Sequence, residues 1–332
     1  MQQIEKFYNV VQGLNERYNY ASMYMETTSE NLKVRLGPAG LHLFNRKSGM
    51  NVLVDEIRPP SHLWSTAPRQ VSIALTNICD LACAYCYAPK NSSSLNLDHL
   101  KEWLIDLDSN GCFGVGFGGG EPTLYPQLVD LFSFVTKKTR LAVTMTTHAH
   151  HLTDSLLNDL NGNINFIRVS MDGTGKNYEL IRGRSFAKLV DRITALSFIA
   201  PFGINFVVNS QTIVDLDSAL HLADRLGASE FLLLPEEPTR GRAGIDEKTF
   251  LELRKWTSKY SGKVPLLISE RRTEGFSICN PLIEETGLAA YAHINAEGFF
   301  KATSYNLNGV QILNNGVIDS LNKLKILERE VA

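Results

Sequence analysis

The central part of the chain alternates short apolar runs with longer segments in which apolar residues recur every three or four positions. The apolar runs predict buried strands at residues 71–76, 113–118, 141–146, 164–170, 204–209 and 230–235. The segments between them have the spacing of helices that turn one face to a core, as in residues 128–138. Apolar strands joined by helical crossovers predict a parallel sheet that is buried on both faces. We therefore expect an α/β fold in which six strand–helix units form a partial barrel rather than a closed eight-stranded one.

The pattern differs on both sides of this barrel. Before it, a helical segment near the start is followed by alternating apolar and polar residues with glycine-containing turns, which predict a small antiparallel β element. After it, the sequence predicts a helix, a hairpin that turns at Glu297-Gly298, and a terminal helix. We divide the chain into an N-terminal element (residues 1–66), the barrel (67–245) and a C-terminal α+β extension (246–332).

Composition narrows the class of protein. Of the 332 residues, 44% are hydrophobic and 20% are charged, as expected for a globular protein with a full core. The formal net charge of −2 gives no broad basic field, so we expect neither nucleic acid nor a membrane as a partner. No apolar run approaches the ~18 residues of a membrane span, and the first residues lack the order of a secretory signal. Five cysteines, an odd number, do not suggest a disulfide framework, and we expect a cytoplasmic location.

Three of the cysteines lie just after the first predicted strand. Cys79, Cys83 and Cys86 form a C-x3-C-x2-C arrangement. Thiolates hold iron–sulfur clusters, and three of them on a four-iron cluster leave one iron open to an exchangeable ligand. The spacing therefore favours a single [4Fe–4S] cluster. Two alternatives stay open: a structural zinc site with a distant fourth ligand from Cys112, Cys279 or a histidine, and simply buried thiols.

The same segment resembles the signature of the radical S-adenosylmethionine (SAM) superfamily, in which an aromatic residue precedes the third cysteine, as Tyr85 does here. One strand–helix unit later, the sequence Gly119-Gly120-Glu121-Pro122 is similar to the GGEP motif of that family. Glycines let the backbone approach a ligand closely, and a carboxylate accepts hydrogen bonds from an ammonium group. The resemblance implies that this motif binds the amino group of the methionyl part of SAM.

Further matches to the family follow in order along the chain. The sequence SMDGTGKNYELIRGRSF resembles its S-x-D-G…R-G segment, and LLLPEEPTRGRA is similar to the subgroup with a C-terminal SPASM or twitch extension. The SAM contacts that these matches imply are Ser170, Asp172, Arg182, Asn209 and Leu234. Arg182 is the candidate partner of the SAM carboxylate, because a guanidinium can donate two parallel hydrogen bonds. A solvated helix start is the alternative for this arginine.

The resemblance implies a specific chemistry. An enzyme of this family cleaves SAM reductively to methionine and a 5′-deoxyadenosyl radical, which then takes hydrogen from a substrate. Its cofactors would be one [4Fe–4S] cluster and SAM, and a flavodoxin or ferredoxin would fit as the electron donor. The protein's task is to position these groups and to exclude water.

The C-terminal extension departs from the family pattern. Its cysteine, Cys279, precedes the hairpin as in relatives, but no cysteine follows, whereas fully equipped relatives bind auxiliary clusters there. An all-cysteine cluster needs four thiolates, so Cys112 and Cys279 cannot build a second one. Cys112 is expected to be a small core residue. For Cys279 both simple packing and a catalytic, substrate-facing role stay open.

Two polar groups lie beside the predicted carboxyl ends of strands. The first contains His148, His150 and His151, where relatives commonly carry a T-N-G turn; here the turn reads Thr147-His148-Ala149. A solvated loop is the favoured interpretation, with a substrate contact or a metal site as alternatives. The second group consists of Glu236, Glu237, Arg240 and Arg242. These residues are either substrate ligands or solvated charges, because parallel-sheet enzymes bind substrate at this edge.

The extension favours a peptide as substrate, since many relatives with it mature ribosomally made peptides. We predict a precursor peptide that acquires a crosslink, an epimerised centre or an oxidised residue, with net oxidation less favoured because no auxiliary cluster is expected. The N-terminal β element could guide a leader peptide by strand addition, or could shield the open edge of the barrel. The alternatives are a radical SAM enzyme for a nucleoside, sugar or amino acid, and an iron–sulfur or zinc protein without turnover.

Overall fold

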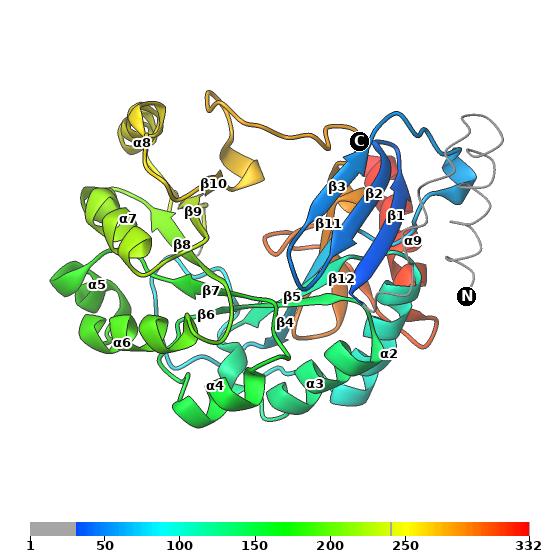
Figure 1. Ribbon diagram of the computed structural model, residues 1–332, viewed down its shortest axis with the longest axis horizontal. Helices are drawn as coiled ribbons and strands as arrows, with labels where there is room; N and C mark the ends of the chain where they lie inside the picture. The colour runs from blue at the N-terminus through cyan, green and yellow to red at the C-terminus, as the bar shows by residue number, and fades with distance from the viewer. Residues whose placement is uncertain (1–30, 240, 332) are drawn as a thin grey trace.

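The computed structural model describes residues 31–239 and 241–331, and the helix expected near the start of the chain lies outside them. All six predicted strands are present and pair in parallel in chain order. They are β4 (Gln70–Thr76), β5 (Gly114–Gly119), β6 (Ala142–Thr147), β7 (Phe166–Ser170), β8 (Phe202–Val208) and β9 (Glu230–Pro235). The sheet curves without closing, so the expected partial barrel is confirmed (Figure 1).

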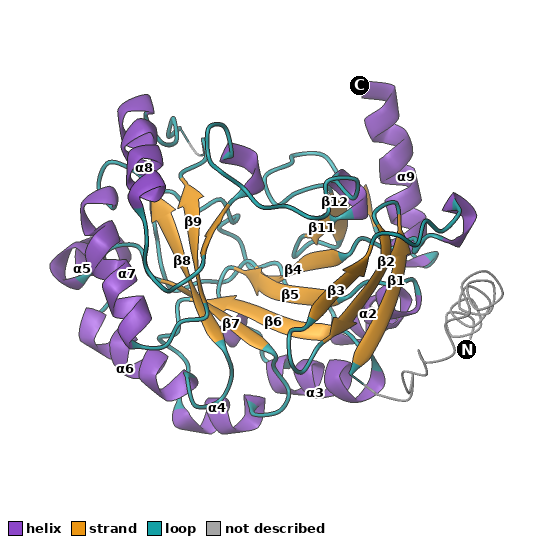
Figure 2. Ribbon diagram, turned by 45° about the horizontal axis from the view of Figure 1, so that its top comes forward, coloured by secondary structure: helices purple, strands orange, loops and turns teal. Residues whose placement is uncertain are grey.

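Helices cover the outer face of this sheet (Figure 2). They are α2 (Leu97–Ser109), α3 (Leu128–Lys138), α4 (Asp154–Leu160), α5 (Gly175–Arg182), α6 (Phe186–Leu196), α7 (Leu216–Arg225) and α8 (Glu247–Lys259). Several begin at a residue whose side chain accepts backbone N–H groups of the first turn, as Asn96 does for α2 and Ser185 for α6. Single 3-10 turns occupy Ser61–Leu63, Pro122–Leu124, Ile213–Asp215, Glu270–Arg272 and Gly287–Ala289. Among the described residues, no helix is long and apolar enough to cross a membrane.

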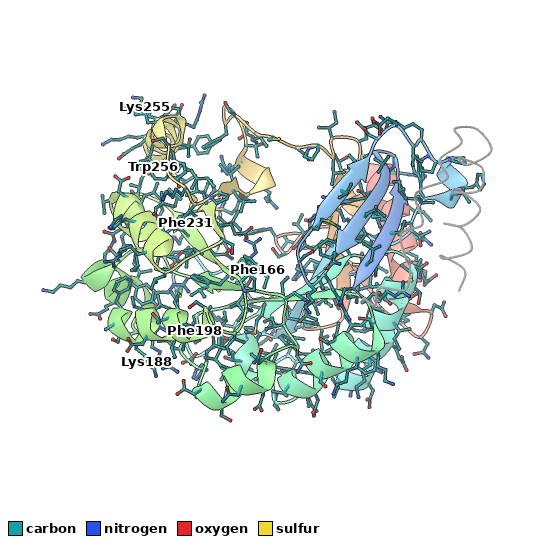
Figure 3. All side chains as sticks on the ribbon, in the orientation of Figure 1. Phe166, Lys188, Phe198, Phe231, Lys255 and Trp256 are labelled. Carbon is teal, nitrogen blue, oxygen red and sulfur yellow. The ribbon has the colours of Figure 1, made fainter. Side chains whose placement is uncertain are left out.

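The core lies between the sheet and these helices. Phe231 of β9 is fully buried, and its ring centroid lies 5.5 Å from that of Phe206 on β8. Figure 3 shows Phe231 at the sheet, whereas Lys188 of α6 and Lys255 of α8 point away from it. The helices thus turn apolar side chains inward and charged ones outward, as their periodicity predicts.

The C-terminal extension continues the barrel sheet at both edges. At one edge, β10 (Leu266–Ile268) pairs in parallel with β9. At the other, β11 (Tyr291–Ile294) pairs in parallel with β4 and begins the predicted hairpin with β12 (Phe299–Lys301) and β13 (Val310–Gln311). The terminal helix α9 (Gly316–Val331) follows. The edge of β4 is therefore shielded by β11 of the extension, and not by the described residues 31–66 of the N-terminal element.

The N-terminal element is a separate antiparallel sheet of β1 (Leu32–Gly37), β2 (Gly40–Asn45) and β3 (Asn51–Val54). It lies against the amino ends of the barrel strands through buried cations. The Arg35 guanidinium donates to the carbonyl oxygens of Ala67, Gly111 and Ala289, at 2.8, 3.1 and 3.0 Å. These carbonyls precede β4, β5 and β11, so the sheet covers the end of the barrel opposite to the carboxyl ends of its strands.

This attachment predicts a large stability effect at Glu285, which pairs with Arg35 at 2.5 Å while both side chains are at most 3% exposed. Glu285→Gln leaves the guanidinium buried without its counter-charge, so we expect the free energy of unfolding to fall by about 3 kcal/mol. Chemical denaturation measures it. The neighbouring Glu284→Gln is the control, because Glu284 pairs with Arg58 on the surface and should lose less than about 1 kcal/mol. Equal effects of the two variants would contradict the account.

Candidate cofactor and substrate site

The three clustered cysteines lie on one loop, which we call the cysteine loop (residues 77–90), after the carboxyl end of β4. Cys79, Cys83 and Cys86 are free and partly exposed. Cationic groups lie beside them: Arg182 Nη1 is 3.4 Å from Cys83 Sγ, and Lys90 Nζ is 3.8 Å from Cys86 Sγ. Thiolates are the ligands that an iron–sulfur cluster requires, and the neighbouring cations would offset the negative charge of such a group.

The other two cysteines do not join the loop. Cys112 is fully buried in the core, as expected. Cys279 is exposed and does not belong to the cavity described below, so its substrate-facing role stays a prediction.

The glycine motif passes directly against the cysteine loop. Gly119 has φ of +113°, and a Cβ added there would lie 2.3 Å from the carbonyl oxygen of Thr76. A Cβ on Gly120 would lie 2.2 Å from that of Ile78. Only glycine fits at both positions. The close approach allows Glu121 N–H to donate to the Ile78 carbonyl at 2.8 Å, which fixes Glu121 next to the first cysteine.

The Glu121 carboxylate is 1% exposed. Its Oε1 accepts from Thr123 N at 3.1 Å, Thr123 Oγ1 at 2.7 Å and Thr147 Oγ1 at 2.6 Å, and its Oε2 accepts from His148 N at 2.9 Å. Within residues 31–239 and 241–331, no lysine or arginine pairs with this carboxylate, and His148 is its only ionisable partner. A buried anion without a cation is suited to the ammonium group of SAM.

A second polar group joins Tyr85, Asp172 and Arg182. Tyr85 Oη donates to Asp172 Oδ2 at 2.6 Å, Arg182 forms an ion pair with the same oxygen, and Val207 N donates to Oδ1 at 2.6 Å. Burial raises the pKa of Tyr85 far above its ordinary value, and Asp172 adds to the effect, so the phenol stays a donor. Burial opposes the charge of Arg182, but Asp172 holds its pKa well above the ordinary value.

One hydrogen-bond donor of Arg182 is unpaired among the described residues. Its Nε is buried and has no hydrogen-bond partner among the described residues. That orphaned donor suits the carboxylate of SAM. Both oxygens of Asp172 are occupied by protein donors, so its role as a SAM ribose contact stays a prediction.

The remaining predicted contacts lie at the same edge of the sheet. Ser170 is the last residue of β7, Asn209 follows the last residue of β8, and Leu234 is the second-to-last residue of β9. Asn209 is buried and donates to Glu236 Oε2 at 2.7 Å, while Glu236 accepts from Arg242 Nε at 2.5 Å. Asn209 and Glu236 therefore form a protein-internal network, and the contacts of Ser170, Asn209 and Leu234 with SAM stay predictions.

The interpretation of the histidines as a solvated loop is wrong for two of them. His148 and His150 are buried, and only His151 is substantially exposed, at 38% of its side chain. Ala149, the one non-glycine residue with positive φ (+66°) among those described, turns the chain inward between them. His150 Nε2 lies 2.8 Å from Tyr178 Oη, and burial lowers the pKa of His150 to about 4, so it is neutral.

Asp80 was not singled out from the sequence, but its side chain contacts the histidines. Its Oδ1 lies 3.0 Å from His148 Nε2, and its Oδ2 lies 2.5 Å from Arg184 Nη2. Burial would raise the pKa of this carboxyl, but Arg184 and the histidines lower it well below its ordinary range. Ligand atoms of Cys79, Asp80 and His148 lie within 4.8 Å of one another. A separate metal ion there would compete with the cluster for Cys79.

A cavity of about 770 Å³ opens beside the glycine motif. Its walls come from β4, β5, the cysteine loop, the loop after β9 and the C-terminal hairpin, and include Asn77, Tyr87, Gly119, Glu237, Arg272 and Tyr305. The rings of Tyr87 and Tyr305 lie 4.9 Å apart between centroids. Small residues widen the inner face of the barrel below it, since Ala74 pairs with Gly118 across β4 and β5.

Glu237 is the predicted polar residue that reaches this cavity. Its side chain is 10% exposed, and its Oε1 is buried without a hydrogen-bond partner among the described residues. Arg271 and Arg272 lie 3.6 and 3.9 Å from its oxygens, too far for tight pairs. Neither arginine was predicted as a site residue from the sequence, although two consecutive arginines could have indicated a polar site. Arg240 lies outside the described residues.

A sequence model of the radical SAM superfamily matches residues 73–246, more than half of the chain. The match includes the cysteine loop, the glycine motif and the strands β5 to β9.

Individual relatives are more distant. The mycofactocin maturase MftC of Mycobacterium tuberculosis is 28% identical over 173 residues, which cover 49% of this chain and 44% of that protein. The chain thus matches less than half the length of MftC. The sporulation killing factor maturation protein SkfB of Bacillus subtilis is 23% identical over 293 residues, or 82% of this chain and 68% of SkfB.

Among solved structures, Streptococcus suis SuiB bound to its precursor peptide SuiA superimposes with a TM-score of 0.71. The alignment covers 88% of this chain and 87% of SuiB at 14% identity, and so it supports the shared fold alone. The matched family model favours the cluster over the zinc alternative. The protein is an enzyme whose cofactors are a [4Fe–4S] cluster and SAM. The chain belongs to the radical SAM superfamily.

Proposed function

We propose that this radical SAM enzyme abstracts hydrogen from a ribosomally made precursor peptide and so introduces a crosslink, an epimerised centre or an oxidised residue. The observation that carries the proposal is the cavity between the glycine motif and the C-terminal hairpin, which is large enough for a peptide segment. The names of the relatives MftC and SkfB, and the peptide bound to SuiB, support the same class of substrate.

Each group of the site has a role in this proposal. Cys79, Cys83 and Cys86 would hold the cluster by three of its irons. When bound, the cluster and SAM would supply a 5′-deoxyadenosyl radical, with an electron from a flavodoxin or ferredoxin. Glu121 accepts the ammonium group of SAM, and Arg182 donates to its carboxylate. Contacts made before cleavage keep the reactive carbon next to the substrate hydrogen.

The polar wall of the cavity matches the amide group of a peptide. Glu237 Oε1 is a buried acceptor with no donor among the described residues, and Arg272 Nε lies 3.9 Å from this oxygen. A peptide amide offers one N–H and one C=O and can satisfy both residues at once. The faces of Tyr87 and Tyr305 would pack against a neighbouring side chain.

Glu237→Gln tests this arrangement. Loss of the charged acceptor should raise KM for the peptide about tenfold and leave kcat nearly unchanged, because the contact is made equally before and during reaction. Initial rates of product formation at several peptide concentrations give both constants. Glu274→Gln, an exposed carboxylate at the same cavity, is the control and should leave KM unchanged. A fall in kcat without a change in KM would argue against substrate anchoring.

The N-terminal sheet is proposed to guide a leader peptide. β3 is one of its two edge strands, and Met50 and Val52 at this edge are exposed. An extended peptide could add to that edge by backbone hydrogen bonds. Because the sheet lies at the amino ends of the barrel strands, the peptide would have to continue around the barrel to reach the cavity.

The proposal is tested with a peptide encoded beside the gene and carrying deuterium on its carbon-bound hydrogens. The expected result is a modified peptide together with deuterium in 5′-deoxyadenosine. Deuterium transfer from a labelled nucleoside, sugar or free amino acid, but not from the peptide, would replace the peptide proposal by its small-molecule alternative.

A further inference from the structure

His148 lies between the cysteine loop and the glycine motif. We propose that it is a positioning residue: its imidazole, which hydrogen-bonds to Asp80 and lies against Glu121, holds the cysteine loop next to Glu121 while the SAM site is empty, and it gives up the contact with Glu121 when the SAM ammonium binds there. The inference rests on the assignment of Glu121 to SAM in the proposed function.

The hydrogen bonds of His148 define its tautomer. Its Nδ1 accepts from the backbone N–H of His150 at 3.2 Å, so the proton of the neutral ring is on Nε2. That Nε2 lies 3.0 Å from Asp80 Oδ1 and 3.3 Å from Glu121 Oε2. The Nε2–H group thus donates to Asp80 on the cysteine loop, and the same edge of the ring lies against the carboxylate of Glu121.

The contact of His148 with Asp80 bears on the cluster ligands, because Asp80 directly follows Cys79 in the chain. Its second oxygen lies 2.5 Å from Arg184 Nη2 and 3.1 Å from His151 Nε2. The cysteine loop is therefore tied to the turn after β6 and to the turn after α5. Of these ties, only the one through His148 also reaches Glu121.

The hydrogen bonds that the Glu121 carboxylate already accepts determine which contact breaks when the SAM ammonium binds. This carboxylate already accepts four hydrogen bonds, and an ionised carboxylate offers about four acceptor positions. An arriving ammonium must therefore displace a neighbouring group. The contact with His148 Nε2, at 3.3 Å, is longer than these four hydrogen bonds, and the Nε2–H group keeps Asp80 as its hydrogen-bond partner. The exchange therefore leaves no buried donor unpaired.

Removal of the imidazole has opposite consequences in the two states. Without SAM, His148→Leu leaves Asp80 and Glu121 facing each other with no donor between them, and their repulsion loosens the cysteine loop. With SAM bound, the ammonium supplies the missing positive charge at Glu121. The variant should therefore release its cluster faster only in the absence of SAM.

The experiment measures the rate at which the reconstituted full-length protein loses iron to a chelator, with and without saturating SAM. We expect His148→Leu to release iron roughly tenfold faster than wild type without SAM, as for loss of an outer-shell partner of a metal ligand. SAM should remove most of that difference. His148→Gln retains an N–H donor and should remain close to wild type. His151→Leu loses a contact with Asp80 alone and should have the smaller effect.

Three results would overturn the role of His148: equal rates for His148→Leu and wild type, equal lability of the leucine and glutamine variants, or an excess rate that SAM does not reduce. Unchanged melting temperatures of the iron-free variants separate the effect from general unfolding, and His148→Met replaces the leucine variant if that does not fold. The change that SAM causes in the electron paramagnetic resonance spectrum of the reduced wild-type cluster tests the proposed function separately. If SAM changes this spectrum and the His148 variants release iron at the wild-type rate, the proposed role of His148 is wrong and the proposed function stands.

Discussion

Cys83→Ser is expected to abolish both cluster binding and SAM cleavage. Cys83 supplies one of three thiolates, and a serine hydroxyl is not ionised near neutral pH and is a poor ligand for iron in a cluster. Its sulfur is also the partner of Arg182 Nη1, at 3.4 Å. The variant would therefore lose an iron ligand and disturb the arginine proposed to bind the SAM carboxylate.

The iron content and the visible absorbance of the reconstituted protein measure the first effect. Cys279→Ser is the matched control, because this cysteine is exposed and lies apart from the cysteine loop and the cavity. It should retain a full complement of about four irons. Retention of the cluster by Cys83→Ser, or its loss in Cys279→Ser, would show that the ligands are wrongly assigned.

Glu121→Gln is expected to weaken SAM binding about 100-fold, which corresponds to about 3 kcal/mol. The side chain is 1% exposed, so its charge interacts with an ammonium group with little screening by water. The amide keeps the shape of the carboxylate but removes its charge. It also replaces one acceptor oxygen by an NH2 group, which faces either the donors of Thr123 and Thr147 or the backbone N–H of His148.

Equilibrium binding of SAM to the oxidised, cluster-loaded protein gives the dissociation constants. Glu237→Gln is a suitable control, since Glu237 is also a buried carboxylate but lies in the wall of the substrate cavity. Its dissociation constant for SAM should equal that of wild type. If both variants bind SAM with wild-type affinity, Glu121 is not the ammonium site.

The strands and helices of the barrel could be predicted because their signal is local. Every strand from β4 to β9 is an apolar run, and every crossover helix repeats apolar residues at helical spacing. The cysteine and glycine motifs were equally local, and the parallel sheet brings them together because both follow the carboxyl ends of adjacent strands.

Pairings between distant segments could not be predicted in this way. β10 is three residues long, too short for a periodic pattern. β11 was expected only as part of a hairpin, and its parallel pairing with β4 depends on a partner far away in the sequence. The burial of His148 and His150 has the same origin. Polarity alone favours a solvated turn, whereas Asp80, Glu121 and Tyr178, each from another segment, provide the partners that make burial favourable.

The most direct test of the central claim is formation of 5′-deoxyadenosine. The protein is purified without oxygen, reconstituted with iron and sulfide, and incubated with SAM and dithionite, in the presence and absence of the candidate peptide. The wild-type protein should form 5′-deoxyadenosine, and Cys83→Ser should form none. A wild-type protein that holds about four irons and binds SAM, but forms no 5′-deoxyadenosine under either condition, would contradict the central claim.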